Sequence, residues 1–302
     1  MEASTAATGK PRKGRGRDLQ GNNLLYHYFQ KTLLEENPEQ FKGVVRGLIL
    51  GLGVWLPISA YERFPLLVPY AARDAACRGD KRRGIPDQWG APDATGRFRD
   101  DNSLIKGIPR SLIVTNPSNG LVNGSRIGTG FVAAHVWRKL RDGSDAPKHE
   151  ATYSFLPNLV WLPAQLAKLT DREGAFAQTL LQAISNSLYR NVPLKPRLAT
   201  FVAPIWEKLP LRDEVAEIDV PLDQLNFFLY ERPWLDRRRR TLRGVQEAIS
   251  AIVGGAPLEA KVVSSRYGNG LRDLEGVAVT PLLDMLTQYA EAVDEADAAA
   301  VE

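Results

Sequence analysis

Apolar residues recur along this chain at two spacings: three to four residues apart in some segments, and continuous or alternating in others. The first spacing predicts helices and the second predicts strands. A helix is predicted to begin at Pro38, because Asn37 can cap a helix and proline suits the first helical position. Within it, Val45 and Ile49 lie four residues apart, as on one buried face.

The middle of the chain contains the clearest strand pattern. Residues 129–137 form an apolar run that carries His135 near its end, and residues 111–114 form a shorter one. The stretch between them is rich in Asn, Gly and Pro, so we expect the two to pair as a hairpin. Asn158 then precedes residues 159–169, which we expect to be helical.

The C-terminal part mixes both patterns. We expect a strand at residues 198–203, a helix at 237–253, a strand at 258–263 and a last helix from Thr280. Together with the middle of the chain, this mixture predicts an α/β protein of the α+β type.

The charge of the chain is mild in sum but uneven in distribution. Lys and Arg number 39 against 35 Asp and Glu, a net charge of +4. Basic residues gather at 10–17, at Lys81, Arg82 and Arg83, and at Arg237, Arg238, Arg239 and Arg240. Basic clusters bind phosphate backbones by releasing counterions. Four arginines at the amino end of a predicted helix also oppose its macrodipole, so we expect them to face an anion.

Several classes of protein are disfavoured by the composition. The longest apolar run, at residues 48–56, is shorter than the roughly 18 residues of a membrane span. The basic N-terminus lacks the apolar core of a secretory signal, so we expect a cytoplasmic protein without a membrane partner. Because Cys77 is the one cysteine, a disulfide framework or a cysteine-based zinc site is excluded.

Residues 84–99 form an irregular stretch rich in Gly, Pro, Arg and aromatic residues. Its Arg97 and Arg99 suit contacts with DNA phosphates or guanine edges, while Trp89 and Phe98 could either contact DNA or pin the loop to the core. We therefore count Arg97 and Arg99 as candidate DNA-binding residues, together with the clusters at residues 81–83 and 237–240.

Two stretches of the middle region carry a resemblance to a known family. Ala134-His135-Val136-Trp137 is followed by Asn158-Leu159-Val160-Trp161-Leu162-Pro163, and then by Thr170-Asp171. The order of strand, histidine, loop and asparagine resembles the HNH, or ββα-metal (His-Me finger), endonucleases, and is closest to restriction-endonuclease-like bacterial members. The resemblance covers about residues 110–190.

The resemblance implies roles for individual residues. His135 corresponds to the general base that activates water, and Asn158 to a residue that either binds the metal ion or fixes the loop that orients the base. Asp171, Asn158 and His149 are the candidate ligands of a divalent cation, Mg²⁺ or Mn²⁺. The chain departs from the family at Ala134 and Ala167, where family members carry metal ligands.

Other interpretations of the same residues stay open. His135 could be a satisfied core histidine, His149 a surface-loop residue, and Asp171 a favourable partner of a helix amino end. Glu259 and Lys261, with Asp219 upstream, resemble the acidic-x-Lys core of the PD-(D/E)XK nucleases. A third interpretation is a non-catalytic DNA-binding protein, or a degenerate nuclease that keeps the fold after losing its metal ligands, and Ala134 and Ala167 favour it.

The resemblance and the patterns together give an expected organisation. A basic arm without regular structure at residues 1–20 precedes a mainly helical part with a DNA-contacting loop at 21–105. An HNH-like ββα-metal nuclease module at 106–192, an α/β part at 193–290 and an acidic tail at 291–302 follow. The expected function is metal-dependent hydrolysis of double-stranded DNA in restriction or antiviral defence, and a homodimer would be the simplest way to cut both strands.

Overall fold

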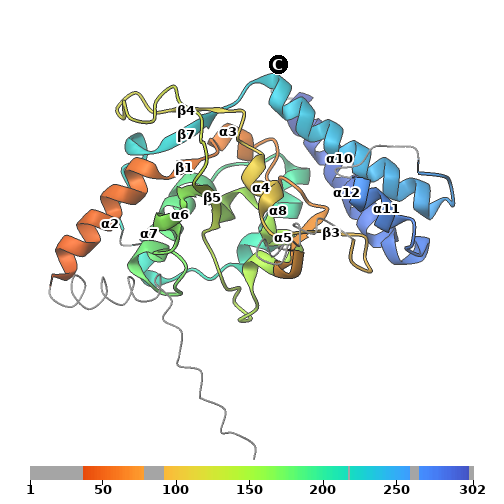
Figure 1. Cartoon of the computed structure of the whole chain (residues 1–302), viewed down its shortest axis with the longest axis horizontal. Helices are drawn as coiled ribbons and strands as arrows, with labels where there is room; N and C mark the ends of the chain where they lie inside the picture. The colour runs from red at the N-terminus through yellow and green to blue at the C-terminus, as the bar shows by residue number, and fades with distance from the viewer. Residues whose placement is uncertain (1–36, 78–91, 217, 259–264, 299–302) are drawn as a thin grey trace, which may run out of the picture. The chain divides into compact units, whose positions relative to one another are not determined.

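The computed structural model of the chain describes residues 37–77, 92–216, 218–258 and 265–298 (Figure 1). The chain divides into two units between Lys42 and Gly43, and the larger unit begins at Gly43. The boundary falls inside the first described helix, α2 (Pro38–Leu52). As predicted, α2 begins at Pro38, and the Oδ1 atom of Asn37 accepts a hydrogen bond from the backbone N–H of Gln40 at 3.2 Å.

The larger unit contains a five-stranded mixed sheet and a second sheet of two strands. The large sheet has the order β4-β7-β1-β6-β5. Its strands are β1 (Val54–Trp55), β4 (Ile113–Thr115), β5 (Phe131–His135), β6 (Leu159–Pro163) and β7 (Asn226–Leu229). β1 and β7 are parallel, whereas β6 is antiparallel to both β1 and β5. The carboxyl ends of β1, β5 and β7 therefore lie at one edge of the sheet.

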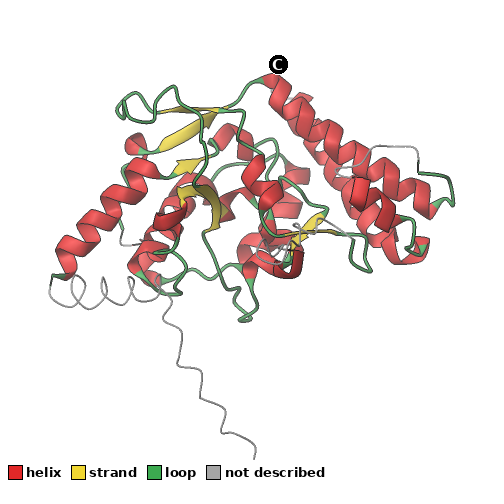
Figure 2. Ribbon diagram, in the orientation of Figure 1, coloured by secondary structure: helices red, strands yellow, loops and turns green. Residues whose placement is uncertain are grey.

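In the small sheet, β2 (Ala71–Arg73) and β3 (Phe98–Asp100) pair in parallel. Helices make up most of the remaining regular structure (Figure 2). After α2, the α-helices are α3 (Ile58–Tyr61), α4 (Ser103–Gly107), α5 (Glu150–Tyr153), α6 (Ala164–Ala167), α7 (Phe176–Ser185), α8 (Pro196–Lys208), α9 (Asp213–Ala216), α10 (Arg232–Val253), α11 (Ser265–Leu271) and α12 (Gly276–Ala298).

Short turns of other helix types complete the connections. These are the 3₁₀ turns η2 (Ala75–Cys77), η4 (Ala146–Lys148), η5 (Leu156–Asn158) and η7 (Leu222–Gln224), and the π-helix η6 (Asn186–Arg190), which continues α7.

The predicted hairpin between residues 111–114 and 129–137 is wrong. β4 pairs with β7, and β4 and β5 lie at opposite edges of the large sheet. β5 pairs instead with β6, which places His135 opposite Leu159. The start of residues 159–169, expected to be helical, is thus a strand, because every residue from Leu159 to Leu162 is buried and a central strand accepts a continuous apolar run.

Other boundaries also differ from the predictions. Residues 198–203 lie within helix α8 and not in a strand, because Leu198, Val202 and Ile205 share one buried face. The predicted helix at 237–253 begins earlier, at Arg232, and the last helix begins at Gly276 with Pro281 inside it. The strand expected at 258–263 falls almost wholly outside the described residues.

The core of the larger unit surrounds helix α7, whose residues Ala177–Ser185 are all buried. Beside it lies an aromatic cluster in which Tyr61 contacts Phe155 and Tyr189, with ring centroids 6.2 and 5.3 Å apart. Trp206 of α8 stands edge-on to Phe155 at 5.3 Å and donates its Nε1–H to the Tyr61 hydroxyl at 3.0 Å. Such edge-to-face contacts and the satisfied indole fix the cluster in one arrangement.

Helices α10 and α12 pack side by side in the C-terminal part (Figure 1). Residues 291–298, expected within an acidic tail, form the last turns of α12, where Asp294 and Asp297 pair with arginines of α10. The α+β fold class is confirmed by the helices and the mixed sheet. The predicted domain boundaries stay predictions.

Candidate functional site

His135 ends strand β5, and its imidazole is held by a backbone carbonyl. The side chain is 6% exposed, and its Nε2 atom lies 3.1 Å from the carbonyl oxygen of Tyr153. Because a carbonyl can only accept, Nε2 must carry the proton and Nδ1 keeps a lone pair. Among the described residues, Nδ1 has no hydrogen-bond partner.

Tyr153 also fixes the plane of this imidazole. Its ring stacks on His135 with the centroids 5.8 Å apart, and its hydroxyl donates to Oδ2 of Asp100 at 2.5 Å. Asp100 is 2% exposed and also accepts the backbone N–H of Leu104 at 2.9 Å. Sequence reasoning missed Asp100 and Tyr153. Asp100 ends β3 shortly before α4, where its carboxylate accepts a backbone N–H of the first turn, but no local signal pairs it with Tyr153.

The pKa of His135 is lowered to about 3. Burial is the main cause, the bond to Tyr153 opposes it, and the positive charges of Arg73 and Arg138 lower the pKa further. The imidazole is therefore neutral at physiological pH. That is the state a general base needs, although so low a pKa makes the base weak.

Asn158 is fully buried and braces the loop around His135. Its Oδ1 atom accepts the backbone N–H of Trp137 at 2.7 Å, and its Nδ2 atom donates to the carbonyl of Thr152 at 2.9 Å. Its own carbonyl accepts the N–H of Val136 at 3.0 Å. His135 and Asn158 are thus neighbours, and both polar atoms of the asparagine amide are hydrogen-bonded to the backbone around the histidine.

The segment after His135 is also anchored to the core. Trp137 donates its indole N–H to the carbonyl of Pro210 at 3.0 Å and stands edge-on to Trp206 at 5.7 Å. Arg141 donates to the carbonyl of Leu209 at 3.2 Å. The loop therefore has a fixed geometry around the imidazole.

The other two predicted metal ligands are engaged elsewhere. Oδ1 of Asp171 lies 2.6 Å from Nη1 of Arg138, and its Oδ2 lies 3.5 Å from Nζ of Lys168. His149 caps α5, because its Nδ1 accepts the N–H of Ala151 at 3.1 Å, and its Nε2 lies 2.9 Å from Nζ of Lys208. Burial and the charge of Lys208 lower the pKa of His149.

These residues do not fit a divalent metal ion as they stand. A Mg²⁺ site needs several free oxygen ligands. Asn158 and Asp171 have theirs occupied, and Ala134 and Ala167 are buried where the family pattern has ligands. Within residues 37–77, 92–216, 218–258 and 265–298, no three His, Cys, Asp or Glu side chains gather as a metal site would require.

A cavity of about 410 Å³ lies beside this region and is lined by charged groups. Its cations are Arg73, Arg138, Lys139 and Lys148, and its acids are Asp145, Asp171 and Glu173. Each acid is paired: Asp145 with Lys139 and Lys148, Asp171 with Arg138, and Glu173 with Arg212. The hydrogen bonds from the two lysines lower the pKa of Asp145 to about 2.

Arg73 differs from the other cations of the cavity. It makes no ion pair within the described part of the chain, and its buried Nε atom has no hydrogen-bond partner there. An unpartnered buried guanidinium N–H is costly unless a ligand or water satisfies it. The cavity therefore presents an uncompensated positive charge near His135, which suits a phosphate group.

The predicted DNA-binding residues fall into different environments. Lys81, Arg82 and Arg83 lie outside the described residues. Arg97 lies 3.5 Å from Glu150 and donates to Thr95 at 2.8 Å, and Arg99 pairs with Asp74 at 3.1 Å. Both arginines are thus held by side chains of the protein.

The four arginines of α10 divide by exposure. Arg237 and Arg240 are exposed, whereas Arg239 is 13% exposed and pairs with Asp297 of α12. Arg238 is half-buried, and burial lowers its pKa, which the neighbouring Tyr70 opposes. Because α10 begins at Arg232, the four do not stand at its amino end as expected, and they point to different sides of the helix.

The second nuclease signature is only partly described. Asp219 is exposed, and its backbone carbonyl accepts a hydrogen bond from Arg46 at 2.6 Å. Glu259 and Lys261 lie outside the described residues.

Comparison of the chain with protein-family models, with curated proteins and with solved structures finds no match. In the part of the chain that the structure describes, no helix is long and apolar enough to span a membrane.

Proposed function

We propose that this chain is an HNH-type endonuclease that hydrolyses phosphodiester bonds in double-stranded DNA, with a role in restriction or antiviral defence. The observation that carries the proposal is the setting of His135. Its Nε2–H is anchored on the Tyr153 carbonyl, its Nδ1 is unpaired within the described residues, and the adjacent loop is braced by Asn158. His135 ends β5 and Asn158 follows after a loop, which agrees with the order of strand, histidine, loop and asparagine on which the resemblance rests.

Each residue around His135 has one role in the proposed hydrolysis. The Nδ1 lone pair of His135 accepts a proton from water as the water oxygen attacks phosphorus and the bond from phosphorus to the leaving oxygen breaks. Tyr153 and Asp100 keep the imidazole in one tautomer. Arg73 and Arg138 offset the negative charge that develops on the phosphate.

A divalent cation, Mg²⁺ or Mn²⁺, is part of the proposal as a cofactor. It has no ligand set among the described residues, so the steps above use only the side chains of the chain. Cleavage with Mg²⁺, with Mn²⁺ and with EDTA decides whether the ion is needed.

DNA binding is proposed for the exposed Arg237 and Arg240, for Arg97 and Arg99, and for the cluster at residues 81–83. A homodimer is proposed because two His135 sites related by a twofold axis would cut both strands. Sedimentation velocity with and without duplex DNA tests this point. A monomer in both conditions contradicts it.

The test of the proposed function is cleavage of plasmid and of linear duplex DNA, methylated and unmethylated, by the full chain. His135→Gln keeps a donor for the Tyr153 carbonyl but removes the Nδ1 base, and should abolish cleavage. The matched control is His149→Gln, which should keep most of the activity. Absence of cleavage on every DNA, or full activity in His135→Gln, refutes the proposal.

A DNA-binding protein without catalysis is the second candidate, and the 6% exposure and low pKa of His135 favour it. It predicts duplex binding without cleavage in any metal. The PD-(D/E)XK alternative predicts cleavage that survives His135→Gln and is lost in Glu259→Ala.

A further inference from the structure

A second hollow, of about 530 Å³, opens at the carboxyl ends of β1 and β7. This size lies within the ~300–1,000 Å³ of small-molecule sites. β7 is separated from β5 by β1 and β6, and three strand spacings of ~4.8 Å amount to about 14 Å. The hollow is therefore separate from the surroundings of His135, although both lie at the same edge of the sheet.

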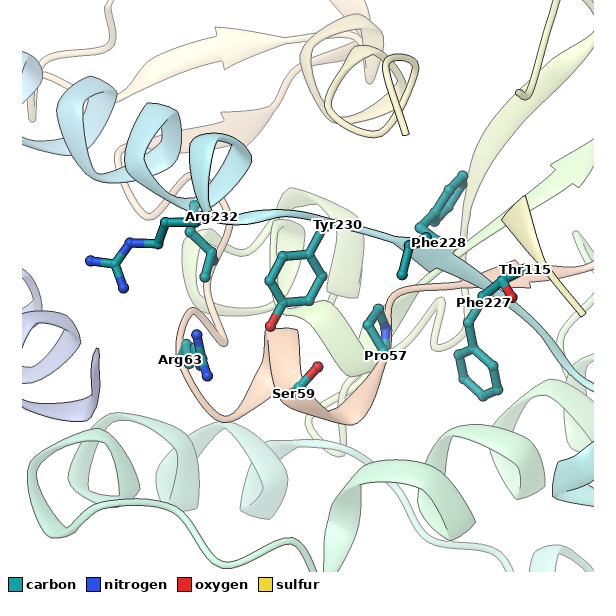
Figure 3. A pocket seen from close by; sticks show the side chains of 10 residues that line it. Pro57, Ser59, Arg63, Thr115, Phe227, Phe228, Tyr230 and Arg232 are labelled. Carbon is teal, nitrogen blue, oxygen red and sulfur yellow. The ribbon is translucent and has the colours of Figure 1, made fainter. Parts of the chain in front are cut away.

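Aromatic side chains line one part of this hollow. Figure 3 shows Phe227 and Tyr230 on one side of β7 and Phe228 on the other. Phe228 is fully buried, whereas Phe227 is half-buried and Leu229, on the same face as Phe227, is 54% exposed. Pro57 lies between the rings of Phe227 and Tyr230 in this view. The hollow thus offers the half-buried rings of Phe227 and Tyr230, and the Tyr230 ring also contacts Trp234 with the ring centroids 5.4 Å apart.

Polar groups occupy the other part. The hydroxyls of Ser59 and Tyr230 line the hollow, and neither makes a hydrogen bond to another described residue. In Figure 3 the Tyr230 hydroxyl points toward Ser59 and Arg63. They are available to the polar edge of a ligand.

Arg63 supplies a positive charge to the same wall. Its Nη1 atom lies 3.7 Å from Oδ1 of Asp297 and makes no hydrogen bond within the described residues. Asp297 is bound more closely by Arg232, at 2.6 Å, and by Arg239. Since one carboxylate is shared by three guanidiniums, Arg63 keeps donors for an anion.

From these contacts we infer that the hollow binds a nucleotide unit, with its base against Phe227 and Tyr230 and its phosphate at Arg63. Aromatic faces beside a cation are the usual means of holding an unpaired base and its phosphate. The choice of a nucleotide rests on the proposed function, whereas the preference for a flat, anionic ligand rests on the lining alone. The unit could come from a free mononucleotide or from an unpaired nucleotide of a DNA strand.

The experiment is isothermal titration of the full chain with dAMP, and separately with deoxyadenosine and with deoxyribose 5-phosphate. We expect dAMP to bind more tightly than either fragment. Phe227→Leu and Arg63→Gln should each weaken dAMP binding by at least about fivefold, the lower limit for loss of one stacked base. Arg197→Gln, an exposed arginine of α8 outside the hollow, is the matched control and should bind as the unaltered chain does.

Three results would overturn the inference: no saturable binding of dAMP, equal binding of dAMP and deoxyribose 5-phosphate, or unchanged affinity in Phe227→Leu. If Arg63→Gln lowers the melting temperature, Phe227→Leu decides, because Phe227 lies outside the core. Competition by a single-stranded oligonucleotide assigns the unit to a DNA strand, and its absence assigns it to a free nucleotide.

The two proposals can fail separately. Binding of dAMP that Phe227→Leu weakens, in a chain that cleaves no DNA, refutes the nuclease and keeps the nucleotide site. Cleavage that depends on His135 in a chain that does not bind dAMP keeps the nuclease and refutes the nucleotide site.

Discussion

Substitution of Asn158 separates the two roles that the HNH resemblance implies for it, metal ligand and brace of the loop. Asn158→Ala removes the acceptor of the Trp137 N–H and the donor to the Thr152 carbonyl. Asn158→Asp keeps the acceptor but sets a carboxylate oxygen against the Thr152 carbonyl, which has no proton to offer. A metal ligand should tolerate this second change, because carboxylates bind Mg²⁺ well. A brace should not tolerate it.

The expected size of the effect follows from burial. Asn158 has no exposed surface, so neither orphaned backbone group can turn to water without moving the chain. Each buried group left without a partner costs about 1–3 kcal/mol. Asn158→Ala should therefore lower the free energy of unfolding by roughly 2–6 kcal/mol, and Asn158→Asp by at least as much, since a buried charge without a partner costs more.

Urea unfolding followed by tryptophan fluorescence measures this, with the melting temperature as a second readout. Asn191→Ala is the control, because Asn191 is exposed and should change the free energy of unfolding by less than about 0.5 kcal/mol. A loss below about 1 kcal/mol in Asn158→Ala, or cleavage retained in Asn158→Asp at unchanged stability, would refute the brace.

Three further predictions concern charge. The lowered pKa of His135 means that between about pH 6.5 and pH 3 the unfolded chain binds a proton at this residue that the folded chain does not bind. The free energy of unfolding should therefore decrease as the pH is lowered through this window, by up to about 1.4 kcal/mol per pH unit from this group. His135→Gln should flatten the plot of urea midpoint against pH, and an unchanged slope contradicts the burial of His135. Asp171→Asn, which breaks a half-exposed pair, should cost less than about 1 kcal/mol and leave the metal requirement of cleavage unchanged, whereas a raised metal requirement would restore Asp171 as a ligand. Arg73→Gln should reduce the slope of the logarithm of the duplex binding constant against the logarithm of the salt concentration by about 1, with little change in melting temperature. An unchanged slope would mean that Arg73 does not contact a phosphate.

The local patterns of the sequence predicted some elements well. Asn37 and Pro38 mark the start of α2, because capping and the fixed φ of proline act within one turn. The run at residues 129–137, with His135 near its end, is predicted as a strand, and β5 covers Phe131–His135 of it. The α+β class also followed from these short-range signals.

Predictions that depended on long-range pairing failed. β5 pairs with β6 and not with residues 111–114, because strand partners are chosen by the packing of whole faces and not by the nearest turn sequence. Residues 198–203 have the composition of a strand but form part of α8, where Leu198 and Val202 pack on the core.

The sequence by itself determined that His135 lies near the end of a strand and that Asn158 precedes the next apolar run, since both follow from neighbouring residues. Only the tertiary structure decided what these residues touch. The Tyr153 carbonyl leaves Nδ1 of His135 as the unpaired nitrogen, and the Asn158 amide binds backbone on both sides of the loop. The tertiary structure also places Asp171 against Arg138, and it leaves Arg73 without an acidic partner among the described residues. Partners of this kind come from segments far apart in sequence, and burial makes their hydrogen bonds obligatory.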